Sequence, residues 1–343
     1  MAASGEDLDA NSTYDYNYDY SDEICNKTEL IKFGAVLTPV FFWIVIMLSL
    51  LGNTLVLVIL IKYENLKSLT NIFIFNLALS DLIFTFGLPF WASYHISGWT
   101  FGNVTCSAVS FIFYTGFYSS IMFLTIMTIH RCLAVVRPLS DLGSTRVCYG
   151  FVSSVIIWNV SFLAAAPALT FVTVEKNRDT MYCEFTDKNW KIGSIYEQNV
   201  CFILSLSIIS FCYIVILLKL LRSRSHTRYR TVKLIFTIVV VFFLGWAPYN
   251  VVIFLKSLTD IGGIPPFNDC AVSKGVDYAF YVCRLIAFSH CCLNPVFYVF
   301  VGVKFRNHLK KMLKKLWLRQ NSLDNSQRNS RVIHSSGEEL SIY

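Results

Sequence analysis

Long apolar runs alternate with short polar segments along the chain, and the runs exceed the ~18 residues that mark a membrane-spanning helix. Apolar residues surround each run instead of following one face, as a helix in lipid requires. The pattern predicts an all-α membrane protein. We expect a bundle of seven transmembrane helices, at residues 33–62, 69–96, 106–136, 146–171, 192–221, 231–257 and 273–302.

The distribution of charge assigns the two sides of the membrane. Residues 219–233 carry six Lys or Arg and no acid, whereas residues 1–32 carry eight acids and two lysines. Lys and Arg accumulate in cytoplasmic loops. We therefore expect a multi-pass protein of the plasma membrane with an extracellular N-terminus and a cytoplasmic C-terminus.

Composition supports a membrane protein and narrows its function. The chain is 55% hydrophobic and 15% charged, against about 25% charged residues in soluble domains. Its outer loops hold no paired nucleophile and base and no metal-spaced His/Cys set, and no internal repeat of the transporter kind is visible. We expect no enzyme, no metal centre, no cofactor and no nucleic-acid partner.

Cysteines and glycosylation sequons agree with this orientation. Four cysteines fall on the predicted outer side, where disulfides persist: Cys25, Cys106, Cys183 and Cys270. Four cysteines permit three pairings, which the residues alone leave open. Three sequons on the same side are candidate glycosylation sites, at Asn11, Asn26 and Asn103.

Polar residues inside the runs mark candidate functional positions. Arg131 follows Cys106 by 25 residues, or roughly 37 Å of helix, and so lies at the cytoplasmic end of the third span. A lone arginine there could simply extend into the headgroups. However, Asn53, Asp81 and Asn294 also lie within spans, and polar groups in lipid are costly and usually functional.

Motifs on successive spans resemble those of the rhodopsin-like G-protein-coupled receptors. "GNTLVLVI", "NLALSDL", "HRCLAVV", "FFLGWAPYN" and "NPVFY" occur in this order over nearly the whole chain. The resemblance implies that Arg131 engages a heterotrimeric G protein when the sixth span moves outward. It implies coupling and activation roles for His130, Arg131, Tyr213, Trp246, Pro248, Asn294, Pro295 and Tyr298.

Two departures from the family pattern carry expectations. His130 stands where the family usually has an acid, and an imidazole holds an arginine less strongly than a carboxylate does, so we expect a weaker resting lock. Asp81 and Ser120 match part of the family's sodium site, but His290 and Cys291 replace its usual polar residues. This replacement argues against sodium binding.

The N-terminal tail points to a basic protein ligand. Its segment "STYDYNYDYSDE" interleaves tyrosines with acids, a composition typical of disorder: the tyrosines are Tyr14, Tyr16, Tyr18 and Tyr20. A plain solvated tail would have the same composition. Tyrosines beside acids are also candidate sulfation sites, and a sulfated acidic arm would attract a basic surface.

Further motifs resemble the chemokine receptors. They are "LPFWA", "YRTVKLIF" and "AFSHCCLNPVFYVFVGVKFR", and among chemokine receptors "FLTIMTIHR" and "CRLIAFSHCC" most resemble the XC type, whose ligand is lymphotactin. The resemblance implies the disulfides Cys106–Cys183 and Cys25–Cys270, chemokine binding outside, and activation of an inhibitory-class G protein with calcium flux and chemotaxis. A non-signalling scavenging receptor, or a receptor for a different peptide, remains the alternative.

Motif position also implies a ligand pocket. We expect its residues to be Trp91, Phe113, Tyr114, Tyr249 and Arg284, with Glu184, Glu197 and Asp277 as acids for the ligand's amino terminus. Most chemokine receptors have glutamate where Arg284 stands. One charge interaction at ~4 Å and a dielectric of ~20 is worth about 4 kcal/mol, so this reversal matters. Either the amino terminus docks elsewhere, or Arg284 pairs internally with Asp277.

The segment after the seventh span, "VKFRNHLKKMLKKLW", predicts a basic amphipathic helix on the anionic inner leaflet. Serines beyond it are candidate substrates of receptor kinases, whose phosphates would recruit arrestin. We divide the chain into an extracellular tail (1–32), a seven-transmembrane receptor domain (33–302), an amphipathic juxtamembrane helix (303–318) and a disordered cytoplasmic tail (319–343).

Overall fold

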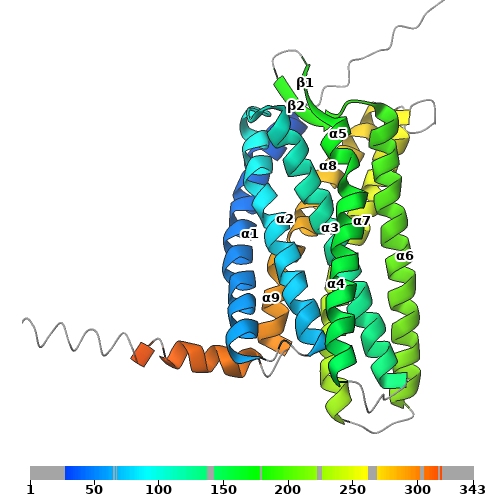
Figure 1. Ribbon diagram of the computed structural model, residues 1–343. Coiled ribbons are helices and arrows are strands. Elements are labelled where there is room, and N and C mark those ends of the chain that lie inside the picture. Colours follow the sequence, from blue (N-terminus) through cyan, green and yellow to red (C-terminus); the bar gives the residue numbers. More distant parts are fainter. Residues whose placement is uncertain are drawn as a thin grey trace, which may run out of the picture.

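The computed structural model describes residues 28–64, 66, 68–136, 143–177, 180–221, 226–261, 269–301, 305–315 and 317–318. Among them, seven helical stretches are long and apolar enough to cross a membrane, and they stand side by side in one bundle (Figure 1). The predicted fold class is confirmed. The long helices are α1 (Thr28–Tyr63), α2 (Leu69–Ser97), α3 (Gly102–Val136), α4 (Gly143–Ala165), α6 (Lys188–Leu221), α7 (His226–Ile261), α8 (Cys270–Phe288) and α9 (His290–Val301).

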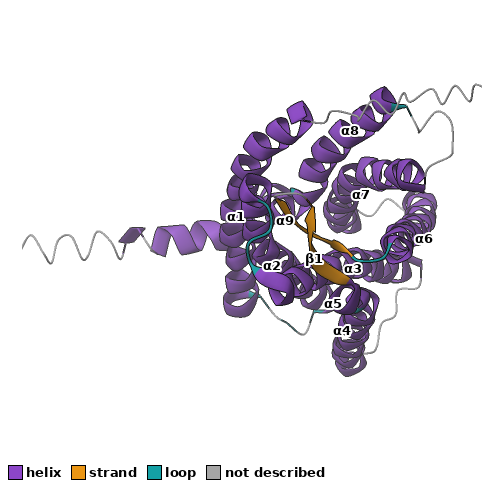
Figure 2. Cartoon of the chain, turned by 90° about the horizontal axis from the view of Figure 1, so that it is seen from above, coloured by secondary structure: helices purple, strands orange, loops and turns teal. Residues whose placement is uncertain are grey.

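Between α4 and α6 the chain forms short elements in addition to the long helices. A short helix α5 (Pro167–Phe171) follows α4 and leads into an antiparallel hairpin of β1 (Val172–Asn177) and β2 (Thr180–Phe185). Its register pairs Val172 with Phe185 and Asn177 with Thr180. Seen from above, the two strands cross the middle of the helix ring (Figure 2). The sequence prediction contained neither strand.

The seventh span is broken into two helices. It was predicted as one run, but α8 ends at Phe288 and α9 begins at His290. Near the break the backbone N–H of Cys292 donates to the carbonyl of Ser289, and the Ser289 hydroxyl donates to the carbonyl of Ile286. These bonds satisfy groups that lipid cannot, so the break is stable inside the bundle. An apolar run has the same appearance with or without such a break.

Proline in α9 explains a polar contact between helices. Pro295 has no N–H, so the carbonyl of Cys291, four residues earlier, lacks its usual intrahelical donor. Asn53 on α1 fills this role, because its Nδ2 donates to that carbonyl at 2.8 Å, and Ser49 Oγ contacts it at 3.3 Å. The side chains of both residues are fully buried. The proline thus selects polar partners on the neighbouring helix.

Aromatic side chains fill the centre of the bundle. Trp246 on α7 is completely buried and its ring lies 4.6 Å from that of Phe117 on α3. Phe288 and His290, on either side of the break, also contact Trp246, at 6.3 and 5.1 Å between ring centroids. Bulky apolar side chains on the outside of the bundle are exposed, Leu51, Leu163 and Phe211 among them, as expected of a lipid-facing surface.

A close approach between α2 and α3 depends on glycine. A Cβ atom at Gly116 would lie 2.8 Å from the Cβ of Phe84 and 3.2 Å from its Cα. Backbone atoms cannot move aside as a flexible side chain can, so any larger residue would push the two helices apart. At Gly193 on α6, in contrast, an added Cβ would meet no atom within 4 Å.

We therefore predict that Gly116→Val destabilises the protein whereas Gly193→Val has little effect. Overpacking of a core typically costs about 1–3 kcal/mol. The measurement is the melting temperature of the purified protein in detergent, and we expect a clear fall for the first variant only. Equal melting temperatures for both variants would show that α2 and α3 do not approach this closely.

Candidate functional site

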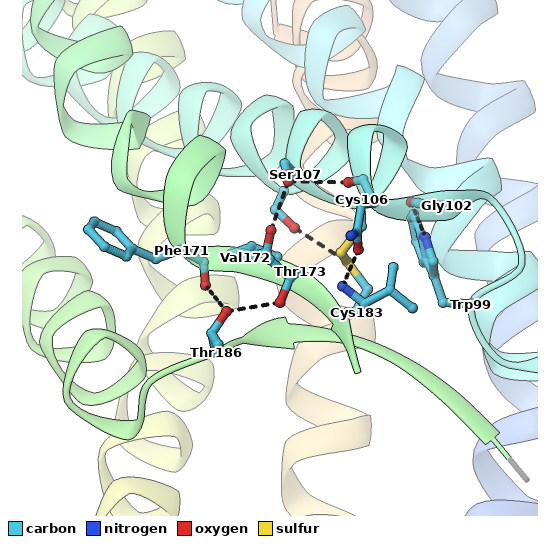
Figure 3. The surroundings of a disulfide bond; sticks show 12 residues. Trp99, Gly102, Cys106, Ser107, Phe171, Val172, Thr173, Cys183 and Thr186 are labelled. Carbon is cyan, nitrogen blue, oxygen red and sulfur yellow. Dashed lines mark hydrogen bonds between the residues drawn. A yellow bond between two sulfur atoms is a disulfide. The ribbon is translucent and has the colours of Figure 1, made fainter. Parts of the chain in front are cut away.

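A disulfide fixes the hairpin over the outer end of the bundle (Figure 3). Cys106 at the start of α3 is bonded to Cys183 on β2, with their Cα atoms 5.7 Å apart, so the first predicted disulfide is confirmed. Beside it, the Ser107 hydroxyl donates to the carbonyl of Val172 at 2.7 Å. These bonds hold both strands against α3 and place the hairpin across the mouth of the bundle.

The second predicted disulfide and the tail sites stay predictions. Cys270 is disulfide-bonded, but Cys25 lies outside the described residues, as do Asn11, Asn26, Tyr14, Tyr16, Tyr18 and Tyr20. Asn103 is described: its side chain is exposed, and its Oδ1 accepts a hydrogen bond from the backbone N–H of Val174 at 2.7 Å. Its glycosylation is not tested by this contact.

Beneath the hairpin lies a cavity of about 420 Å³. Its lining is mainly aromatic and apolar with a few charged groups, as in ligand-binding pockets generally. It brings together seven of the predicted ligand residues: Trp91, Phe113, Tyr114, Glu184, Tyr249, Asp277 and Arg284. Glu197 does not line it, and its side chain is exposed on α6 beside Tyr118.

The cavity ends on the central aromatic cluster. Tyr249 and Phe288 line the cavity and also contact the ring of Trp246, at 5.5 and 6.3 Å between centroids. A group pressing on either residue therefore acts directly on Trp246. The resemblance implied a role for Trp246 in activation. Its contacts with Tyr249 and Phe288 connect it to the cavity.

Asp277 pairs with a lysine of another helix. Its Oδ1 lies 2.5 Å from Nζ of Lys256 on α7, and that ammonium also lies 4.9 Å from the ring centroid of Phe280. The alternative in which Arg284 pairs internally with Asp277 is not found among the ion pairs of the described residues. Seven residues along a helix span about 10.5 Å, whereas α7 runs beside α8 and brings Lys256 into direct contact.

Arg284 instead contacts a histidine. Its side chain is only 9% exposed, and its guanidinium meets Nε2 of His95 on α2. It also lies over the rings of Phe280 and Tyr281, at 5.1 and 5.2 Å from their centroids. A guanidinium has only donors, so His95 accepts through an unprotonated nitrogen. Among the described residues no carboxylate neutralises Arg284.

Sequence reasoning missed His95, Lys256 and Tyr281, which all line the cavity. None belongs to a motif quoted above, and each acquires its place through contacts between helices. The one usable signal was a polar or charged side chain near the outer end of a predicted span.

Below the aromatic cluster lies a buried carboxylate. Asp81 on α2 is fully buried and accepts a hydrogen bond from Nδ2 of Asn294 at 2.8 Å. Ser120 donates to its other oxygen at 3.5 Å, and Nε2 of His290 lies 3.7 Å from that oxygen. Since the His290 ring also contacts Trp246, it joins the carboxylate to the floor of the cavity. Whether sodium binds there stays a prediction.

At the end of the bundle opposite the hairpin, Arg131 is held by α2. Its guanidinium donates to the Thr70 hydroxyl, and the neighbouring His130 ring lies edge-on to Phe73 on the same helix, 6.4 Å between centroids. Tyr213 on α6 is buried against Phe236 of α7, at 5.0 Å.

The remaining predicted activation residues lie on α7 and α9. Pro248 is inside α7 and Pro295 inside α9. Tyr298 is also in α9, but its side chain is outside the described part of the structure.

The juxtamembrane helix begins where α9 has ended. Residues 305–315 are helical and extend sideways from the lower end of the bundle, away from the ring of long helices (Figure 1). Nε2 of His308 lies 3.1 Å from Oε1 of Glu64, and the His308 ring stacks on Tyr63 at 5.6 Å. Its start is thereby attached to the end of α1, while its lysines are exposed.

Comparison with known proteins identifies the class. Residues 52–298 match the family described as 7 transmembrane receptor (rhodopsin family), and the chain belongs to that family. It is 46% identical over 308 residues to chemokine XC receptor 1 of Homo sapiens, covering 89% of this chain and 90% of that protein. It is 47% identical over 304 residues to chemokine XC receptor 1 of Mus musculus, covering 88% and 91%.

The likeness extends to other chemokine receptors. C-C chemokine receptor type 4 of Homo sapiens is 36% identical over 304 residues, covering 87% of this chain and 84% of that protein. The chain is therefore a chemokine receptor, a G-protein-coupled receptor that crosses the plasma membrane several times. The receptor class predicted from its motifs is confirmed.

The Arg131–Thr70 contact predicts which interaction keeps the receptor inactive when no ligand is bound. Hydrogen bonds to charged groups are worth about 1.5–3 kcal/mol, so Thr70→Val should raise ligand-independent signalling severalfold, while Thr70→Ser should not. His130→Asp supplies a carboxylate beside Arg131 and should lower ligand-independent signalling. Basal cyclic AMP inhibition at matched surface expression measures all three.

Unchanged basal signalling in Thr70→Val would show that the threonine does not restrain Arg131. A His130→Asp receptor no quieter than the parent would contradict the expectation of a weak lock.

Proposed function

We propose that this chemokine receptor binds a basic, lymphotactin-like chemokine at its extracellular side and activates an inhibitory-class heterotrimeric G protein at its cytoplasmic side. The observation that supports the proposal is a continuous series of side chains in contact, from the cavity to the centre of the bundle. It starts at a cavity lined by Tyr249 and Phe288, passes through Trp246, and reaches Asp81 at the centre of the bundle. Cells would respond with calcium flux and chemotaxis.

Binding would begin at the tail. Residues 1–32 hold eight acids against two lysines, and sulfation of the four tail tyrosines would add further negative charge. Complementary charge accelerates encounter and fixes orientation. A disulfide from Cys25 to Cys270 would bring this arm to the outer end of α8. The tail would thus hold the body of the chemokine above the cavity.

The flexible segment of the chemokine would then enter the cavity. Among the lining residues, Phe113 and Tyr114 are on α3, and Trp91 is on α2. The Cys106–Cys183 disulfide joins α3 to the hairpin. Contact with Tyr249 would displace the ring of Trp246, because the two rings already touch. Pro248, two residues further along α7, removes a backbone hydrogen bond and makes a bend there less costly. The inner half of α7 could then swing outward.

Outward movement of α7 would open the inner end for the G protein. Tyr213 packs on α7 through Phe236, so this contact would be lost as Arg131 leaves Thr70. Asn294 and Pro295 would allow the course of α9 to change, and Tyr298 would take part in this change. His130 lies against Phe73, so the G protein would meet an imidazole beside Arg131 in place of the acid usual in the family.

The inner face would be completed by lipid and regulatory proteins. The exposed lysines of the juxtamembrane helix would lie on anionic lipid headgroups. Serines of the cytoplasmic tail, 319–343, would be phosphorylated by receptor kinases and would then recruit arrestin. Together with the tail at 1–32, the receptor domain at 33–302 and the helix at 303–318, these segments make up the proposed domain organisation.

Lymphotactin added to cells that express the chain should inhibit cyclic AMP production and raise cytosolic calcium. Pertussis toxin, which uncouples inhibitory G proteins, should abolish the first response. Arg131→Ala, at matched surface expression, should bind lymphotactin and remain silent. Uptake of lymphotactin by the unmodified receptor without either response would instead favour a scavenging receptor, and the absence of binding would exclude this ligand.

Replacing Tyr14, Tyr16, Tyr18 and Tyr20 together by phenylalanine should weaken lymphotactin binding about tenfold, since each exposed ion pair contributes about 0.2–1 kcal/mol and 1.4 kcal/mol is tenfold. Competition binding at low and high salt tests this. The difference should shrink at high salt because exposed charges are screened. Equal affinities at low salt would mean that the tyrosines carry no sulfate that contacts the ligand.

A further inference from the structure

We propose that Arg284 forms a carboxylate-binding position in the cavity, and that the ligand segment entering the cavity presents an acidic side chain there instead of its ammonium terminus. This inference rests on the proposed chemokine function and adds the chemical class of the group that is recognised. It assigns to Arg284 the selection of charge within the cavity.

The first support is the state of Arg284 itself. The side chain is more than nine-tenths buried, and a guanidinium keeps its charge in proteins. Its contacts are the neutral nitrogen of His95 and the faces of two aromatic rings, while its Nε has no hydrogen-bond partner. These contacts tolerate a positive charge but do not cancel it. A buried charge without an opposite charge is costly, so pairing with an incoming carboxylate would offset part of the desolvation of both groups.

The second support is that the nearby acid is already engaged. Asp277 lies 2.5 Å from Lys256, so it is not free to neutralise Arg284 without leaving a second cation unpaired. Among the described residues, the cavity lining holds three cations, Lys191, Lys256 and Arg284, and two acids, Glu184 and Asp277. The balance is positive, and the positive group furthest from solvent is Arg284. An ammonium group in that place would be repelled.

The third support is the geometry of the guanidinium. Its planar fork matches a carboxylate with two parallel hydrogen bonds. Phe280 and Tyr281 cover it with their rings, and His95 meets one terminal nitrogen. The unpartnered Nε and the cavity beside it leave room for a second acceptor. A carboxylate could therefore bind without dismantling the aromatic surroundings.

The position of Arg284 connects this site to signalling. Phe288 lies one helical turn further along α8, where it lines the cavity floor and contacts Trp246. A carboxylate that pulls on Arg284 would shift this turn of α8 against Trp246. We therefore expect loss of the ligand acid to reduce signalling potency more than total binding, because the tail would still hold the chemokine.

The test pairs receptor variants with ligand variants. Each acidic residue in the flexible segment before the first cysteine of lymphotactin is replaced in turn by its amide, and one further variant has an acetylated amino terminus. Calcium potency and competition binding are measured on the unmodified receptor, Arg284→Gln and Arg284→Lys. Lys191→Gln, which removes another cation of the same cavity, is the matched control.

We expect one acid-to-amide change to lower potency about tenfold or more on the unmodified receptor, as for other buried charge pairs. The same change should have no further effect on Arg284→Gln, and it should keep its effect on Lys191→Gln. Arg284→Lys should retain part of the dependence, because lysine supplies a point charge. Acetylation should leave the dependence intact. Equal losses on the unmodified and Arg284→Gln receptors would overturn the proposal.

A second measurement needs no chemokine and so separates this proposal from the proposed function. The purified receptor is heated with millimolar acetyl-Ala-Glu-Ala-amide or with its glutamine counterpart. Binding to the folded state raises the melting temperature, so the glutamate peptide should raise it in the unmodified receptor but not in Arg284→Gln. Should the glutamine variant fail to reach the membrane, Arg284→Lys replaces it, with a smaller rise expected. Identical shifts with both peptides would overturn the proposal even if lymphotactin proves to be the ligand.

Discussion

Lipid cannot accept or donate hydrogen bonds, and this constraint governs where every polar group of the receptor lies. The clearest case is the carbonyl of Cys291, which loses its intrahelical donor to Pro295 and recovers one from Asn53 on α1. Without that side chain, this carbonyl would keep only the longer contact of Ser49, at 3.3 Å. The proline of α9 and the polar side chains of α1 are therefore linked by this interaction.

The same constraint explains why three charged residues mark three levels of the bundle. Arg284 lies at the outer cavity, Asp81 at the centre and Arg131 at the inner end, and each contacts a polar group of another helix. In water such contacts would be minor. Inside the bundle they define alternative arrangements of the helices, because a charge that leaves one partner must find another. The aromatic cluster around Trp246 joins the level of Arg284 to the level of Asp81 by direct packing.

What could be predicted from sequence depended on how local the signal was. The spans follow from runs of apolar residues: five of the predicted runs each fall on one helix, whereas the fourth continues into α5 and the seventh is divided between α8 and α9. The disulfide from Cys106 and five residues of the cavity lining followed from resemblance to the family, since motif positions carry over to a shared fold: Trp91, Phe113, Tyr114, Tyr249 and Arg284. The hairpin β1–β2 was missed because alternation in so short a segment is weak beside the long apolar runs.

Partners that lie on different helices could not be predicted. A pair of Asp277 with Arg284 along one helix was one of two alternatives, but Asp277 pairs with Lys256 of the neighbouring helix. His95 and Thr70 similarly hold Arg284 and Arg131 from α2, although nothing in their own sequence neighbourhoods indicates this. Such contacts depend on how helices are rotated and spaced, and small side chains such as Gly116 set that spacing.

The orientation of the bundle is the claim on which the outer cavity and the inner arginine both depend. The direct measurement is antibody access to one epitope tag placed before residue 28 and another between residues 222 and 225, in intact and in permeabilised cells. The account predicts that the first tag is reached in intact cells and the second only after permeabilisation. Access to both tags in intact cells, or to neither, would contradict it.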